Sequence, residues 1–332
     1  MVRGLGIGIS VACVLLLAGC GRQSTLSPRS PQTHAIRTLW WWMLAAATVV
    51  FLGAVTMLIL AWVTRGRKGL PFFGEREPVA QGLVVVFGIA IPIVALIALF
   101  GGADVYLVGQ TAPPGPRTTA LTIQVVGHQW WWEIHYPGTR AVTANEIHIP
   151  VNTRVNVVTT TADVIHSFWV PQLARKIDLV PGRRNRILLY ASRPGVYRGQ
   201  CAEFCGLQHA HMSLEVVAQP AQAYRAWLAD MTSPAPPATG AAAATGLHLF
   251  MADQCASCHQ IRGTSASGTV GPDLTHLASR RTLAAATIPN VPGELERWIL
   301  NPQNIKPGDR MPDLGLPRSQ VKDIVTYLDG LK

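Results

Sequence analysis

The sequence of 332 residues predicts a multi-domain fold: a two-helix transmembrane hairpin, an all-β Greek-key domain and an all-α domain. Two uncharged stretches near the N-terminus, residues 39–63 and 79–103, predict the hairpin. Short apolar runs separated by Pro-Gly pairs predict the β domain. A change to Ala, Pro and Thr around residue 220, followed by helical patterns, predicts a separate helical domain.

The composition excludes several classes of protein. Charged residues make up 14% of the chain and hydrophobic residues 49%, whereas soluble chains average about 25% charged residues. Part of the chain is therefore expected in lipid, and a wholly disordered chain is excluded. The net charge of +10 is spread along the chain without a long basic run, so no binding of nucleic acid is expected.

Residues 1–19 are expected to be a lipoprotein signal peptide. One early charge, Arg3, precedes an apolar stretch at 11–18, as in secretory signals. The run Leu17-Ala18-Gly19-Cys20 resembles a bacterial lipobox, which implies cleavage before Cys20 and attachment of lipid to its thiol. The alternative is a plain N-terminal membrane helix. Residues 20–38 are then a periplasmic N-terminal segment.

Residues 39–104 are expected to form the transmembrane hairpin. At about 1.5 Å per helical residue, each uncharged stretch exceeds a hydrocarbon core of about 30 Å. The loop between the two stretches has an excess of basic residues, which favours the cytoplasmic side: Arg65, Arg67, Lys68 and Arg76. Together with the export signal, this loop places both later domains on the periplasmic side of a bacterial plasma (inner) membrane.

Residues 118–218 are expected to form the β domain. The expected strands are 121–126, 146–150, 154–160, 186–190 and 214–217. Turn-rich segments with Pro-Gly pairs at 137–138, 181–182 and 194–195 separate them. This spacing predicts a β-sandwich or a Greek-key barrel.

A cluster of soft metal ligands lies in this domain. Cys201 and Cys205 share one short segment, His209 and Met212 follow, and His166 lies upstream. Thiolate, imidazole and thioether together suit copper rather than magnesium or calcium. A mononuclear blue-copper site needs only one Cys, so the second thiolate indicates a pair of coppers bridged by both sulfurs.

Two other interpretations of the cysteines stay open. A disulfide between Cys201 and Cys205 suits an oxidising compartment, but it leaves His166, His209 and Met212 unexplained. Zinc held by the two cysteines and the two histidines is possible by count. The methionine and the single tight loop favour copper.

Residues 219–246 are expected to be a linker with a short helical stretch at about 224–231, and 247–332 the helical domain. The run Cys255-Ala-Ser-Cys258-His259 predicts covalent attachment of a c-type haem, with His259 as an iron ligand. Redox use as in thioredoxin is the alternative, and it expects a βαβ context. A distal Met would give a His/Met haem, and the candidates are Met251 and Met311.

The helical domain resembles a class I cytochrome c. In that family the axial Met lies in a loop such as Gly308-Asp-Arg-Met311-Pro312, so the resemblance implies that Met311 is the second iron ligand. The run Gly271-Pro272-Asp-Leu matches the loop whose Pro carbonyl accepts the proton of the proximal His. The last helix is expected over about 317–330.

Residues 35–220 resemble cytochrome c oxidase subunit II. The motifs that carry the resemblance are Gly127-His-Gln-Trp-Trp-Trp-Glu133, Asp163-Val-Ile-His166-Ser, Lys176-Ile-Asp178, Val180-Pro-Gly-Arg183 and the loop from Cys201 to Met212. The resemblance implies a two-span anchor and an all-β cupredoxin domain that holds the mixed-valence dinuclear copper centre Cu(A).

The same resemblance implies a role for each ligand. Cys201 and Cys205 bridge both coppers, His166 and Met212 complete one copper, and His209 and the backbone carbonyl of Glu203 complete the other. The Glu203 side chain resembles the family's Mg ligand at the junction with subunit I. Trp130 resembles the aromatic residue at which electrons reach the copper domain.

The expected function is that of subunit II of a haem–copper cytochrome c oxidase with its own haem c. Electrons from cytochrome c, or from an upstream respiratory complex, would pass through haem c and Cu(A) to the haems of subunit I, where O2 becomes water with proton translocation. The expected partners are subunits I and III. The alternatives are a Cu(A)-bearing subunit of a nitric oxide or nitrous oxide reductase, and a non-catalytic copper or haem lipoprotein.

Overall fold

The structure, a computed structural model, describes residues 23–64, 77–115 and 118–332. It divides into a helical unit, Pro31–Ala112, and a second unit that includes Pro113–Lys332. The expected signal peptide, the expected lipid site Cys20 and the basic loop residues at 65–76 lie outside the described residues.

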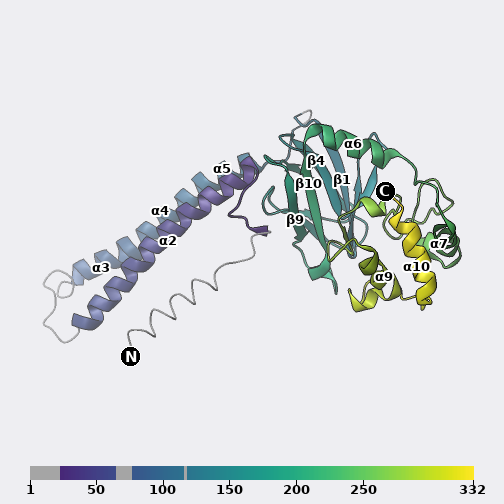
Figure 1. The fold of residues 1–332 in the computed structure, drawn as a ribbon. Coiled ribbons are helices and arrows are strands. Elements are labelled where there is room, and N and C mark those ends of the chain that lie inside the picture. Colours follow the sequence, from purple (N-terminus) through teal and green to yellow (C-terminus); the bar gives the residue numbers. More distant parts are fainter. Residues whose placement is uncertain (1–22, 65–76, 116–117) are drawn as a thin grey trace, which may run out of the picture. The chain divides into compact units, whose positions relative to one another are not determined.

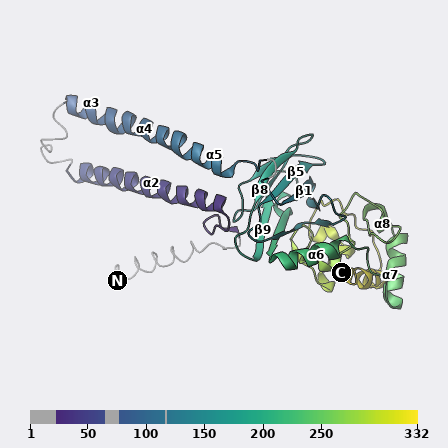
Figure 2. The same ribbon diagram turned by 90° about the horizontal axis from the view of Figure 1, so that it is seen from above.

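Two long apolar helical segments make up the helical unit (Figure 1). The first is α2, Pro31–Thr64. The second runs from Glu77 to Thr111 and comprises α3 Glu77–Val85, α4 Ile91–Ala98 and α5 Val105–Thr111, joined by the π-helical turns Val86–Ala90 and Leu99–Asp104. The two lie side by side in both views (Figure 2). Both begin before and end after the expected stretches 39–63 and 79–103.

The apolar side chains of this unit are exposed. No residue in the most hydrophobic part of either segment is buried inside the unit, and Trp40, Trp41 and Trp42 are all exposed. Helices of this length that are apolar on all sides are stable where lipid covers them. The chain is therefore a membrane-anchored protein with two candidate spans.

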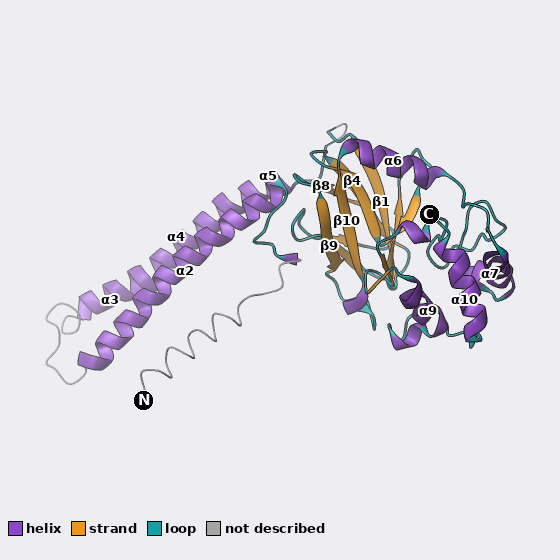
Figure 3. Cartoon of the chain, viewed as in Figure 1, coloured by secondary structure: helices purple, strands orange, loops and turns teal. Residues whose placement is uncertain are grey.

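The β domain is a sandwich of two five-stranded sheets (Figure 3). The first sheet has the order β3-β2-β1-β5-β8, built from β1 Leu121–His128, β2 Trp131–His135, β3 Val142–Ala144, β5 Val155–Thr161 and β8 Asn185–Leu189. The second has the order β4-β10-β9-β6-β7, built from β4 Glu146–Pro150, β6 His166–Trp169, β7 Ile177–Leu179, β9 Gly195–Cys201 and β10 Ser213–Gln219. All five expected strands are present, and β2, β3, β6, β7 and β9 are additional.

The sandwich core follows from residues that alternate along the strands. In β1, Ile123 and Val125 are fully buried, and in β5 Val155 and Val157 are fully buried, because every second side chain of a strand points to the same face. Each sheet of this Greek-key fold contains one parallel pair of strands: β1 with β5 in the first sheet and β10 with β4 in the second.

Helix α6, Ala221–Thr232, belongs to the sandwich although it lies in the expected linker 219–246. Tyr224 and Met231 are part of the sandwich core, and the Trp227 ring stacks on His148 with 4.0 Å between ring centroids. The helix predicted at about 224–231 is thus present and packed. Only residues 233–240 remain between α6 and the next helix.

The C-terminal domain is helical, with α7 Ala241–Ala252, α8 Cys255–Cys258, α9 Pro292–Leu300 and α10 Arg318–Asp329, and one small hairpin of β11 Thr282–Leu283 and β12 Ile288–Pro289. Helices α7 and α10 cross closely at Gly246, where a Cβ atom would lie 2.0 Å from the Asp323 carbonyl oxygen. Phe250, Ile324 and Leu328 fill the core between them. Helix α10 confirms the helix expected over 317–330.

Candidate copper and haem sites

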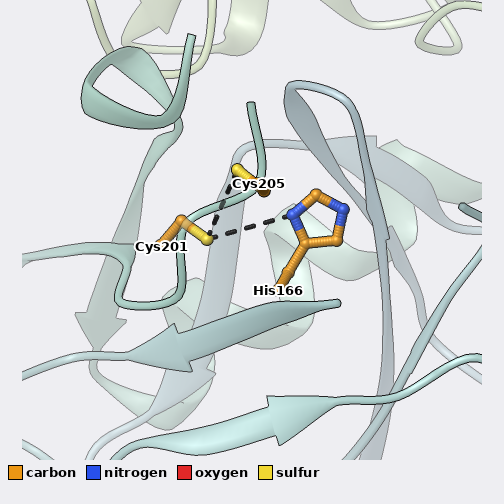
Figure 4. A group of neighbouring side chains, drawn as sticks. All are labelled: His166, Cys201 and Cys205. Atoms are coloured by element: carbon orange, nitrogen blue, oxygen red, sulfur yellow. Dashed lines mark hydrogen bonds between the residues drawn. The ribbon is translucent and has the colours of Figure 1, made fainter. Parts of the chain in front are cut away.

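Two free, buried cysteines lie at the end of β9 and in the loop that follows it. The Sγ atoms of Cys201 and Cys205 are 3.8 Å apart (Figure 4). A disulfide requires about 2.05 Å between its sulfurs. The structure therefore holds a dithiol at this position and not the disulfide that the sequence left open. The loop from Cys201 to Met212 is called the copper loop below.

Four more donor atoms surround these sulfurs. His166 Nδ1 lies 3.9 Å and the Glu203 carbonyl oxygen 3.2 Å from Cys201 Sγ. His209 Nδ1 lies 3.6 Å and Met212 Sδ 3.8 Å from Cys205 Sγ. Donors that share a metal at about 2.0–2.3 Å have separations of this size. All six residues expected as ligands are therefore gathered, and their soft donor atoms fit copper.

Asp163 orients His166, a role that the sequence analysis did not assign. The Nε2–H of His166 donates a hydrogen bond to Asp163 Oδ1 at 2.8 Å, which leaves Nδ1 directed at the sulfurs. Burial opposes the charged form of Asp163, but hydrogen bonds from His166 and from two backbone N–H groups outweigh it and lower the pKa of the carboxyl group. An acid three residues before a ligand His is the signal that would have found it.

Gly127 in β1 lets the strand lie against the same imidazole. A Cβ atom at this position would lie 2.8 Å from His166 Cδ2 and 3.1 Å from Leu179 Cδ2. Since His166 is fully buried, the ring has no room to withdraw. Any side chain at position 127 would therefore displace the His166 imidazole.

The two thiols influence each other's protonation. The hydrogen bond between the sulfurs lowers the pKa of Cys201, and the same bond, with burial, raises the pKa of Cys205, so Cys201 loses its proton first. A metal cation binds thiolates and releases their protons, so copper would bind both sulfurs as thiolates.

Trp130 contacts the copper loop directly. Its Nε1–H donates to the Cys205 carbonyl oxygen at 3.0 Å, and Gln129 Nε2 donates to the same oxygen at 2.8 Å. Trp130 is only 6% exposed. The neighbouring Trp131 instead stacks on His128, and Trp132 lies in the sandwich core against Phe168. Of the three consecutive tryptophans, Trp130 is the one bonded to the copper loop.

The haem-attachment residues lie on α8 and directly after it. Cys255 and Cys258 are both free, and the Nδ1–H of His259 donates to the Pro272 carbonyl oxygen at 2.8 Å, as the resemblance implied. Burial lowers the pKa of His259, so the ring is neutral at pH 7. A neutral imidazole with Nδ1 bonded to a carbonyl presents Nε2 to a metal.

Gly271 lets the chain after α8 lie directly against the His259 imidazole. A Cβ atom there would lie 2.5 Å from His259 Cε1. The free Cys pair, the oriented histidine and this glycine fit a covalently attached haem.

Met311 lies in a structured loop of the same domain. Its N–H donates to Asp309 Oδ1 at 3.0 Å, and its carbonyl oxygen accepts from Gln303 Nε2 at 3.0 Å. No described contact joins its sulfur to His259, so its role as iron ligand stays a prediction. The other candidate, Met251, is half-buried in α7 and packs against the domain core.

The comparisons with known proteins identify both domains. Residues 138–219 match the family of the periplasmic domain of cytochrome c oxidase subunit II, and residues 243–332 match the cytochrome c family. Cytochrome c oxidase subunit 2 of Alkalihalophilus pseudofirmus is 31% identical over 330 residues, which cover 96% of this chain and 94% of that protein. The Bacillus subtilis subunit 2 is 28% identical, with 96% and 95% covered.

The chain is also similar in sequence to a protein of known structure. The periplasmic domain of subunit II of the Bradyrhizobium japonicum cytochrome oxidase is 33% identical with a TM-score of 0.33, and it covers 34% of this chain and 93% of that one. Identity over nearly the whole length, with both domains matched in order, establishes the family. The chain belongs to the cytochrome c oxidase subunit 2 family and carries a C-terminal cytochrome c domain.

Proposed function

We propose that this chain is the subunit through which electrons reach the core of a haem–copper cytochrome c oxidase. Electrons come from cytochrome c or from an upstream respiratory complex, and pass by way of haem c and Cu(A) to subunit I, where O2 is reduced to water with proton translocation. One observation carries the proposal: two free thiols 3.8 Å apart have four further donor atoms of the types that Cu(A) needs at 3.2–3.9 Å from one or other sulfur.

The ligand roles follow the gathered donors. Cys201 and Cys205 would hold both coppers, His166 and Met212 would complete the ligands of one, and His209 with the Glu203 carbonyl those of the other. When bound, the copper pair accepts and returns one electron without making or breaking bonds to substrate. The protein holds the donors in place and keeps water out, since Cys201, Cys205 and Met212 are 4% exposed or less.

The helical domain supplies the haem in this proposal. Cys255 and Cys258 attach it through thioethers, His259 and Met311 bind the iron, and Pro272 holds the His259 ring in one orientation. The exposed Glu203 side chain would bind Mg at the boundary with subunit I. Subunits I and III are the proposed partners, and the bacterial plasma membrane, with Cys20 lipidated, is the proposed location.

Purification of the complex tests the proposal. We expect two coppers and one haem c per chain, a near-infrared Cu(A) band, and O2 uptake driven by reduced cytochrome c. Cys201→Ser should abolish the near-infrared band and leave haem c, while Cys258→Ser should do the reverse. Absence of copper, a Cys201–Cys205 disulfide, or nitric oxide or nitrous oxide reduction without O2 uptake would contradict the proposal.

A further inference from the structure

The loop that carries Met311 lies against the copper loop. Residues 302–311 are called the docking loop. The Lys306 ammonium donates to the backbone carbonyl oxygen of Trp130 at 2.9 Å, and Gln208 Nε2 of the copper loop donates to the Pro307 carbonyl oxygen. At Gly308 a Cβ atom would lie 2.8 Å from Leu207 Cδ1. The haem domain thus reaches the copper site through one short segment.

Lys306 is the buried charge in this contact. It is 2% exposed, although lysine is almost never fully buried without a partner. Its ammonium also forms an ion pair with Asp309 Oδ2 at 3.1 Å. Burial of an ammonium is costly unless its hydrogen bonds are made, and here one bond stays within the docking loop and one crosses to Trp130. If the two loops separated, the Trp130 carbonyl would lose this donor.

Trp130 joins the two loops. Its carbonyl accepts from Lys306, and its indole Nε1–H donates to the Cys205 carbonyl at 3.0 Å. Two hydrogen bonds, with Trp130 between them, therefore connect Lys306 of the docking loop to the backbone of Cys205, a proposed copper ligand. Met311, the proposed iron ligand, is five residues from Lys306 in the same loop.

We propose that Lys306 is a positioning residue that fixes the docking loop on Trp130, so that the haem domain delivers its electron to the copper site from a single docked arrangement. The inference rests on the proposed function. In the step concerned, one electron leaves the ferrous haem and is taken up by the oxidised copper pair, and no proton or bond changes place.

The other described contacts between the two domains do not join a buried charge of the docking loop to Trp130. Arg310 also donates to Gln129 Oε1 and forms an ion pair with Asp163 Oδ2 at 4.0 Å, but its side chain is 61% exposed, and exposed ion pairs contribute little. Arg281 N–H donates to Glu146 Oε2 at 2.9 Å, and Arg198 donates to the Ala286 carbonyl at 2.9 Å. These last two bonds join segments other than the docking loop and the copper loop.

The test compares Lys306→Met with Lys322→Met in the purified oxidase complex. Met keeps most of the side-chain volume of Lys but has neither charge nor N–H donor, and Lys322 is exposed on α10. A photoexcited ruthenium complex supplies one electron to haem c, and the rate of its transfer to Cu(A) is followed by absorption. Hydrogen exchange of the peptides that contain 302–311 and 128–135 is measured in parallel.

We expect Lys306→Met to slow the internal transfer by about tenfold or more, because removing one partner of a buried charged hydrogen bond across an interface weakens it by at least that factor. Exchange in both peptides should accelerate, while the Cu(A) spectrum and both midpoint potentials stay as in the wild type. Lys322→Met should behave as the wild type.

Two outcomes would overturn the inference: wild-type transfer and exchange in Lys306→Met, or a lost or altered Cu(A) spectrum, which would make Lys306 part of the copper site itself. If Lys306→Met does not accumulate, Lys306→Gln, which keeps an N–H donor, should show faster exchange in the same peptides, and unchanged exchange there overturns the inference. A wild-type complex without copper would instead refute the proposed function.

Discussion

At the scale of single residues, Asp163 fixes the tautomer and the orientation of His166, a proposed copper ligand. Its Oδ1 accepts the Nε2–H of His166 at 2.8 Å, and its Oδ2 accepts the Gln129 N–H at 2.7 Å. Outer carboxylates of this kind raise the basicity of a ligand His, and their loss typically lowers metal affinity by about 10–100-fold. Asp163→Asn should therefore lower copper affinity by about that factor.

Competition with a copper chelator, with the Cu(A) band as readout, measures this effect. Asp178→Asn is the matched control, because Asp178 is exposed in β7 and its side chain bonds no ligand. Equal copper affinities in the two variants would mean that His166 is oriented by the fold alone.

Glu133 makes a second residue-scale prediction, which concerns pH. Its two carboxylate oxygens accept hydrogen bonds from His128 Nε2 and His135 Nε2, each at 3.1 Å. Burial opposes the charge, but these bonds and the charge on the histidines outweigh it, and the pKa of Glu133 is lowered from 4.5 to about 2. Because the folded-state pKa is depressed, the stabilisation is present above about pH 4.5 and is lost as the pH falls toward about 2.

Glu133→Gln should remove that stabilisation. The variant should be less stable than the wild type by at most about 3 kcal/mol near pH 6, and the difference should vanish near pH 2. Denaturant unfolding of the copper-free proteins across this range measures it. A difference that stays constant with pH would show that the ion pairs are not its origin.

At the scale of elements, the strands that the sequence predicted are those with a clear alternation. β5 buries Val155 and Val157 and directs the residues between them outward, so its pattern alone indicates a strand. β6 and β7 have four and three residues. Strands so short hold no full alternation. β6 pairs with β9, which comes three strands later in the chain, and β7 pairs with β6.

The residues of the candidate sites also divide into those that a local sequence pattern predicts and those that depend on contacts with distant residues. The types of the five side-chain donors, four of them in one short loop, could be predicted from the sequence, whereas the Glu203 carbonyl and the Pro272 contact were implied by the family resemblance; the structure brings all six proposed copper donors together. Gly127 and Lys306 act through contacts with residues that other elements bring to them, and Lys306 reaches Trp130 across 176 positions. No local pattern carries such a contact.

Helix α6 packs as part of the copper domain, so truncation of its Trp227 side chain should lower the stability of that domain. Trp227 stacks on His148 at 4.0 Å and contacts Tyr136 edge-on at 5.1 Å. Trp227→Ala should cost about 2 kcal/mol, below the ~3–5 kcal/mol of a fully buried Trp, because the ring is only half-buried. The temperature at which the Cu(A) band is lost measures the cost.

Arg225→Ala is the control, because Arg225 is exposed on the same helix, and this variant should leave that temperature unchanged. Equal shifts in both variants would contradict the packing argument.

The docking loop makes a prediction for the haem. If Met311 binds the iron, Met311→Ala should lower the midpoint potential of haem c by the order of 100 mV, since axial ligands set haem potentials over about 0.8 V. Met251→Ala, which removes a half-buried side chain of the domain core, should leave the potential unchanged. An unchanged potential in Met311→Ala would assign the second iron ligand to another residue. Redox titration of the haem absorption band distinguishes these outcomes.

At the scale of the whole molecule, the chain combines a membrane anchor with two redox domains that share an interface. Residues 233–240 are the only segment between α6 and α7, and a connection this short keeps the two domains at an effective concentration in the millimolar range. Buried contacts then select one arrangement among those that the connection allows. Under the proposed function, haem c and Cu(A) are therefore permanent neighbours, and only the external electron donor to haem c arrives by diffusion.

This organisation predicts two different responses to salt. The internal transfer from haem c to Cu(A) should change by less than about twofold between about 0.01 and 1 M salt, because Lys306 is 2% exposed and buried pairs are screened little. Reduction of haem c by an external soluble cytochrome should change by about tenfold or more, because charged surfaces steer that encounter. Flash reduction and stopped-flow mixing of the same complex measure the two rates. A parallel fall of both rates with salt would mean that the haem domain leaves the copper loop and returns by diffusion, and the docked arrangement would then not be the one that transfers the electron.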